Sequence, residues 1–281
     1  MLAKQPIGIF DSGIGGLTVL RKLQNALPHE HFVYFADTAN LPYGEKTPEQ
    51  IINYAQQTLS WMQNEMGVKL AVAACHTSST TALDIVSPHF SIPIIGTIYP
   101  MVEALLEHHQ NERIGIIATP TSVQSRMHET ILKNAGFEGE IFSISCPKFV
   151  PIIETGRISG PELIRTTSEY LEIFKTQNLN TLVYGCTHYP WIADVVEQIL
   201  PTNVKFIDPA EHIAKHVSLE LYKHKMLNTS WNKLNVDFYS SGSPTRFAAQ
   251  INLLLSIPMP KVKQVNFTKS DWNSQKFAVN Q

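Results

Sequence analysis

The sequence lacks any long apolar run. None of its stretches approaches the ~18 consecutive apolar residues that a membrane-spanning helix needs. Near the start, one lysine is followed by a short apolar stretch that Asp11 and Ser12 interrupt, which is too short for the core of a signal peptide. We therefore expect a cytoplasmic protein with no membrane partner.

The sequence also has few cysteines and a small net charge. The three cysteines, Cys75, Cys146 and Cys186, are too few for a disulfide framework, so we expect free thiols, metal ligands or catalytic groups. The formal net charge is -2, and no cluster of lysine and arginine with interleaved aromatics is present, so no nucleic-acid partner is expected. The 281 residues suffice for one large or two ordinary α/β domains.

Short apolar runs alternate with stretches of helical periodicity along most of the chain. The expected strands are 6–10, 31–36, 70–74, 92–96, 114–118, 139–144, 181–184 and 204–207. The expected helices are 17–27, 48–66, 101–108, 122–134, 161–175 and 192–200. This alternation predicts an α/β fold with mainly parallel sheets, in which ligands bind at the carboxyl ends of the strands.

The chain contains two versions of one plan. IGIFDSG at 7–13 is echoed by IGIIATP at 114–120, and LAVAACHTSS at 70–79 is echoed by TLVYGCTHYP at 181–190. Asp11 precedes Cys75 by 64 positions, and Thr119 precedes Cys186 by 67. The repeat predicts two similar α/β domains that face each other, with the active site in the cleft between them.

The first domain is expected to span 1–97 plus about 211–256, and the second 98–210. In the returning segment, a strand at 236–240 and a helix at 244–255 would complete the first domain. The tail, 257–281, is polar and weakly patterned, and the sequence does not place it.

Cys75 and Cys186 both stand where a buried strand ends and a helix begins. Backbone N–H groups at a helix start can lower a thiol pKa from ~8.5 to ~3.5–7.5, which would favour reactive thiolates. A single free cysteine is more often a small buried hydrophobe. Two cysteines at equivalent places in duplicated halves favour function, whereas Cys146 has no counterpart and is interpreted as structural.

Three further features are expected near the same carboxyl ends of the predicted strands. Asp11 opens the glycine-rich loop DSGIGG, as a functional acid or a helix cap, and the glycines allow backbone to approach a ligand closely. His188 follows Cys186 by two residues and could bond the thiol or act as a base. The turn LPYGEK at 41–46 could present Tyr43 or Gly44 to a ligand.

Racemisation of an amino acid is the chemistry that needs such a pair. Inversion at Cα requires one base on each face, because a single base would return the proton to the side it left. Two facing domains would place Cys75 and Cys186 on opposite sides of a flat carbanion-like intermediate, one as thiolate and the other as thiol.

The sequence resembles the glutamate racemase family of the aspartate/glutamate racemase superfamily. The resemblance lies in IGIFDSGIGGLTVL, YFADTANLPYGEK, AVAACHTSST, IIATPTSV, CPKFVPIIETG and GCTHYP, over about the first 210 residues. It implies interconversion of L- and D-glutamate without pyridoxal phosphate, another cofactor or a metal, for bacterial peptidoglycan synthesis and cell shape. A homodimer is expected.

The resemblance also implies roles for individual residues. Cys75 and Cys186 would be the catalytic thiols, with Asp11 and His188 as acid/base partners and Glu154 as a further acidic group. Besides these residues, the expected substrate contacts are Ser12, Pro42, Tyr43, Gly44, His76, Thr77, Thr119, Thr121 and Thr187. At His76 the family commonly has asparagine, so substrate binding is where this chain would differ.

Three alternatives remain open. One is a racemase of the same superfamily for aspartate or another amino acid. Another is a dinucleotide-binding oxidoreductase with Asp37 as the ribose-binding acid, although G-x-G-x-x-G fails at Thr18 and Asp11 would repel a pyrophosphate. A metal site of two cysteines and two histidines is the third, and its spacing does not match the usual zinc pattern.

Overall fold

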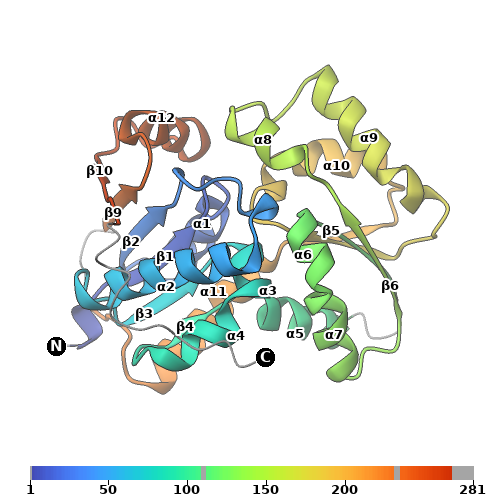
Figure 1. Cartoon of the computed structure of the whole chain (residues 1–281). Helices are drawn as coiled ribbons and strands as arrows, with labels where there is room; N and C mark the ends of the chain where they lie inside the picture. The colour runs from blue at the N-terminus through green and yellow to red at the C-terminus, as the bar shows by residue number, and fades with distance from the viewer. Residues whose placement is uncertain (1, 109–111, 231–234, 268–281) are drawn as a thin grey trace.

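The computed structural model describes residues 2–108, 112–230 and 235–267. The chain forms two parallel sheets flanked by helices, which confirms the predicted α/β class (Figure 1). No helix in these residues is long and apolar enough to cross a membrane.

The larger sheet has the strand order β10–β9–β2–β1–β3–β4, and every pairing in it is parallel. Its strands are β1 (Ile7–Asp11), β2 (His31–Ala36), β3 (Leu70–Ala73), β4 (Ile94–Ile95), β9 (Asn235–Ser240) and β10 (Val262–Gln264). The smaller sheet has the order β6–β5–β7–β8 and is also parallel throughout. Its strands are β5 (Arg113–Ala118), β6 (Glu140–Ser145), β7 (Thr181–Gly185) and β8 (Lys205–Ile207).

The two sheets repeat one topology, since β2–β1–β3–β4 and β6–β5–β7–β8 follow the same order. The registers also correspond: Phe10 lies opposite Ala73 in one sheet, and Ile117 opposite Tyr184 in the other. Two residues beyond these pairs stand the two cysteines of the sequence repeat. We call the part built on the larger sheet the first half and the part built on the smaller sheet the second half.

Helices cover both sheets (Figure 1). They are α1 (Leu17–Ala26), α2 (Pro48–Asn64), α3 (His76–Thr81), α4 (Leu83–Val86), α5 (Ile98–His108), α6 (Pro120–Ser125), α7 (Met127–Asn134), α8 (Phe149–Glu154), α9 (Pro161–Lys175), α10 (Ala193–Ile199), α11 (Pro209–Lys223) and α12 (Pro244–Leu255). Between the sheets, α3 packs against α6. Strands β1, β3 and β7 are buried along their whole length, as expected for strands covered on both faces.

Several details differ from the sequence prediction, among them the unpredicted short helix α8. The expected helix 122–134 is two helices, because Arg126 adopts a left-handed conformation with φ 52° between α6 and α7. Helix α11, capped by the Asp208 side chain on the Ala210 amide, was not predicted and packs against α1 and α5. The tail contributes β10 as an edge strand on β9, and residues 268–281 lie outside the described part.

The domain limits near 97 and 210 stay a prediction. The strands of the first half come from 7–95 and 235–264, and those of the second from 113–207.

Candidate active site

The carboxyl ends of the central strands of both sheets border one cavity. It holds about 430 Å³ of space, counting the part open to solvent. Most of the predicted contacts line it: Ser12, Pro42, Tyr43, Gly44, Cys75, His76, Thr77, Thr119, Cys186, Thr187 and His188. Cys146, interpreted from the sequence as structural, also lines this cavity.

Cys75 is a buried thiol at the start of α3. It is 5% exposed, and its Sγ donates to Ser12 Oγ at 4.0 Å. Burial, and next the charge of Asp11, raise its pKa to about 12, although contacts with Ser78 oppose the shift. The expectation of a lowered pKa at Cys75 is therefore wrong, because the dipole of so short a helix is outweighed by loss of solvent. In this structure Cys75 favours the thiol form.

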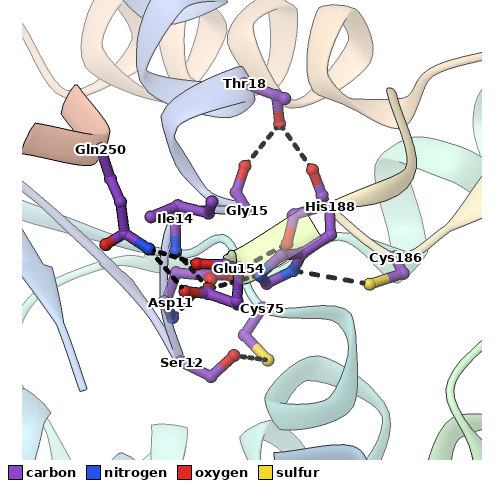
Figure 2. A network of polar contacts seen from close by, with 12 residues as sticks. Asp11, Ser12, Ile14, Gly15, Thr18, Cys75, Glu154, Cys186, His188 and Gln250 are labelled. Atoms are coloured by element: carbon purple, nitrogen blue, oxygen red, sulfur yellow. Dashed lines mark hydrogen bonds and ion pairs between the residues drawn. The ribbon is translucent and has the colours of Figure 1, made fainter. Parts of the chain in front are cut away.

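Cys186 stands at the end of a chain of polar contacts (Figure 2). Its Sγ lies 3.8 Å from Nδ1 of His188, and Nε2 of the same ring lies 2.8 Å from Oε1 of Glu154. The Ile14 amide donates to the same oxygen at 2.9 Å, and Gln250 Nε2 donates to Oε2 at 3.1 Å. Thiol, imidazole and carboxylate of the second half thus stand in series, and two groups of the first half bond the carboxylate.

In this series of contacts, His188 and Glu154 each stabilise the charged form of the other. Burial disfavours a charged His188, but its hydrogen bonds with Cys186 and Glu154, and their charges, raise its pKa well above the ordinary value. For Glu154, burial is likewise outweighed by the hydrogen bond and charge of His188 and by the Ile14 amide, so its pKa is lowered. An imidazolium next to Cys186, backed by a carboxylate, can stabilise a thiolate and can hold or return a proton.

Asp11 lies behind the cavity wall. Its Oδ2 accepts from the Gly13 amide at 2.9 Å, and its Oδ1 accepts from Thr187 Oγ1 at 3.1 Å. Burial raises its pKa, and the charge of His188 and these hydrogen bonds oppose the rise. The carboxylate of Asp11 bonds its own loop and Thr187 and does not line the cavity, so its contact with the substrate stays a prediction.

Two other predicted residues also stand outside the cavity wall. Thr121 Oγ1 donates to the Gly44 carbonyl at 2.8 Å, so it joins α6 to the LPYGEK turn and does not face the cavity. Glu154 reaches the site through His188. A further contact between the halves joins Thr77 Oγ1 and Thr119 Oγ1 at 3.0 Å.

The glycine-rich loop approaches protein side chains, where a close approach to a ligand was expected. A Cβ on Gly13 would overlap the Glu154 carboxylate, and a Cβ on Gly15 would overlap both His188 and Thr187. Because these glycines have no side chain, the loop of the first half can pack directly against Glu154, His188 and Thr187. Gln250, in α12, was missed entirely, since nothing local to it indicates a contact with Glu154.

Asp37, the acid on which the dinucleotide alternative depends, is fully engaged in holding turns. It accepts from Tyr43 at 2.5 Å and from Ser241 at 2.6 Å, and Asn40 donates to both of its oxygens. Its carboxylate fixes the LPYGEK turn at the cavity edge.

The chain has clear relatives among known proteins. Residues 7–217 match the family model described as Asp/Glu/Hydantoin racemase. A glutamate racemase of Picosynechococcus sp. is 40% identical over 276 residues, covering 98% of this chain and 97% of the relative. One from Trichormus variabilis is 42% identical over 266 residues, covering 94% and 89%.

Solved structures agree with these relatives. The crystal structure of glutamate racemase from Francisella tularensis in complex with D-glutamate superposes with a TM-score of 0.85 at 36% identity, covering 94% of this chain and 98% of that one. The Thermus thermophilus glutamate racemase, in complex with β-chloro-D-alanine, gives 0.84 at 32% identity over 94% and 98%. The resemblance seen in the sequence is confirmed, and the chain belongs to the Asp/Glu/Hydantoin racemase family.

Proposed function

We propose that this chain interconverts L- and D-glutamate, with Cys75 and Cys186 as the two acid/base groups. One observation carries the proposal: the two thiols occupy equivalent register positions at the strand ends of two repeated sheets and line one cavity. Inversion at Cα needs one proton carrier on each face, and a pair related by the repeat meets that need.

The reaction moves one proton off Cα and another onto it. In one direction the Cys186 thiolate takes the Cα proton and becomes a thiol, which leaves a planar carbanion whose charge spreads into the carboxylate. The Cys75 thiol then gives its proton to the opposite face and becomes a thiolate. The reverse direction exchanges the two roles, and atoms and charge balance in each.

The surroundings of the thiols differ, and this suits their starting states. Cys75 favours the thiol form because it is buried beside Asp11. Next to Cys186, the protonated His188 and the Glu154 carboxylate supply the charge pattern that stabilises a thiolate. Cys75 is thus suited to donate a proton, and His188 and Glu154 stand where they can assist Cys186 as the group that accepts one.

Proton transfer by a positioned group contributes about 10²–10⁴-fold in rate, which is too little for so weak a carbon acid. Hydroxyl and amide donors at the strand ends supply more by stabilising the negative charge on the substrate carboxylate. The hydroxyl-bearing residues that line the cavity are Ser12, Tyr43, Thr77, Thr119 and Thr187, although Thr187 already donates to Asp11 and Tyr43 to Asp37. Asp11 acts through Thr187 and the glycine loop that it orders.

Glutamate as substrate rests on the relatives, because the thiol pair specifies the chemistry and leaves the side chain open. A chiral assay of L-glutamate against L-aspartate tests it. We expect L-glutamate to reach an equal mixture of enantiomers and L-aspartate to stay unchanged. Cys75→Ala and Cys186→Ala should each abolish racemisation, whereas the matched thiol variant Cys146→Ala should keep racemising. Faster turnover of L-aspartate would contradict the assignment.

The setting of the enzyme is part of the same proposal. D-glutamate would supply peptidoglycan synthesis, and the protein would work in the cytoplasm as a homodimer. The two domains would comprise 1–97 with about 211–256, and 98–210. Sedimentation of the purified chain tests the dimer, since a mass near the monomer's 31.5 kDa at all concentrations would contradict it.

A further inference from the structure

The proposed mechanism leaves one buried polar side chain at the cavity unused. His76 follows Cys75, begins α3, is 3% exposed and contributes to the cavity lining. Neither of its ring nitrogens has a hydrogen-bond partner among the described residues. A buried polar group without a partner costs roughly 1–3 kcal/mol, so such a group calls for an explanation.

A second histidine lies against it. His128, in α7, is 2% exposed, and its ring centroid lies 6.0 Å from that of His76, with 31° between the ring planes. Its Nε2 also lacks a partner in the described chain. The left-handed residue Arg126 separates α7 from α6, and His128 stands two residues after it. The pair joins the first half to the second.

The repeat gives this contact a counterpart. By register, the residue after Cys75 corresponds to the residue after Cys186, so His76 corresponds to Thr187. Thr187 crosses to the other half and donates to Asp11 at 3.1 Å. His76 also meets the opposite half, but there it meets a ring, and it makes no hydrogen bond with any residue that the structure describes. Its hydrogen-bonding groups are therefore left for a ligand.

Both rings are uncharged near neutral pH. Burial, and next the charge of His128, lower the pKa of His76 well below its usual value. Burial lowers the pKa of His128 to about 4, and only the charge of Glu129 opposes that shift. A neutral imidazole offers one donor and one acceptor, which are the functions of an amide side chain. An α-amino acid has an ammonium donor and a carboxylate acceptor to match them.

We infer that His128 is a positioning residue, whose ring holds the ring of His76 at the cavity so that His76 can serve the substrate's ammonium or carboxylate group. The inference rests on the proposed racemase function. It assigns the unpartnered ring nitrogens of His76 to substrate binding, and it makes His128 in the opposite half necessary for that task. His128 itself touches no substrate.

A double-mutant cycle tests the inference through KM and kcat for glutamate. In the wild-type background, His128→Ala should raise KM about tenfold, within the coupling expected for contacting residues, and should change kcat less. In a His76→Asn background the amide no longer needs the ring, so His128→Ala should change KM less than about twofold. An equal rise in both backgrounds, or no rise in either, would overturn the inference.

Two further measurements keep the test decisive. Ile131→Ala, one turn along α7 and lining a separate cavity, should leave KM unchanged, which controls for disturbance of the helix. If His128→Ala does not fold, His128→Gln replaces it in the cycle. In ¹⁵N-histidine NMR, added D-glutamate should shift the His76 ring nitrogens, and unshifted nitrogens under saturation would refute its contact. Absence of racemisation by the wild type would instead count against the proposed function.

Discussion

Replacing Glu154 by glutamine should show how the polar chain behind Cys186 works. The carboxylate lies 2.8 Å from His188 Nε2, and the two side chains are only 4% and 2% exposed. A hydrogen bond to a charged group contributes about 1.5–3 kcal/mol, so its loss in the transition state predicts about a 10- to 150-fold fall in kcat/KM. The fall must be equal for L- and D-glutamate, because enantiomers have the same free energy.

The pH dependence gives this prediction a direction. Glu154 helps to raise the pKa of His188, so removal of its charge should lower that pKa. A histidine with a raised pKa is still an imidazolium at neutral pH, and it loses its proton as the pH rises through that pKa. The alkaline limb of kcat/KM should therefore move to lower pH in Glu154→Gln.

A chiral assay of both enantiomers across pH measures these effects. Glu162→Gln is the matched control, because it removes an exposed carboxylate paired with Arg157 and should change nothing. A Glu154→Gln enzyme within twofold of wild type at every pH, with an unmoved alkaline limb, would refute the reasoning.

Three more predictions follow from particular contacts. Because the pKa of Cys75 is about 12, its alkylation by iodoacetamide, followed by peptide mapping, should accelerate about tenfold per pH unit up to pH ~10, and a plateau near pH ~8–9 would contradict this. Lys69→Met leaves its buried partner Glu30, 2.5 Å away, without a countercharge, so urea unfolding should show a loss of about 3–5 kcal/mol, and a loss under about 1 kcal/mol would be inconsistent. Gly15→Ala should displace His188 and lower kcat/KM by about 100-fold while the fold persists by circular dichroism; full activity would show that the loop can yield.

Local patterns in the sequence were enough to predict most of the fold. Buried parallel strands appear as uninterrupted apolar runs, and this is why β1, β3 and β7 were found within a residue or two of their observed bounds. The break at Arg126 was missed because arginine gives no local signal for a left-handed conformation. The short strand β10 was missed because its residues form a strand only by pairing with β9.

Some residues of the active site could likewise be predicted from local sequence patterns, and others could not. Residues at strand ends, such as Cys75 and Cys186, could be placed at the cavity from the repeat alone. Gln250 could not, because it reaches Glu154 across 96 positions of sequence through tertiary packing. The raised pKa of Cys75 also escaped prediction, since burial beside Asp11 is a property of the folded chain.

The most direct test of the two-thiol account is racemisation in deuterated water. Starting from L-glutamate, the D-glutamate formed in the first turnovers should carry deuterium at Cα. The hydrogen delivered to Cα comes from the second thiol, which has exchanged with the deuterated solvent. The remaining L-glutamate should keep its original proton. D-glutamate that retains the substrate's own proton would mean that one base serves both faces, and would contradict the roles proposed for Cys75 and Cys186.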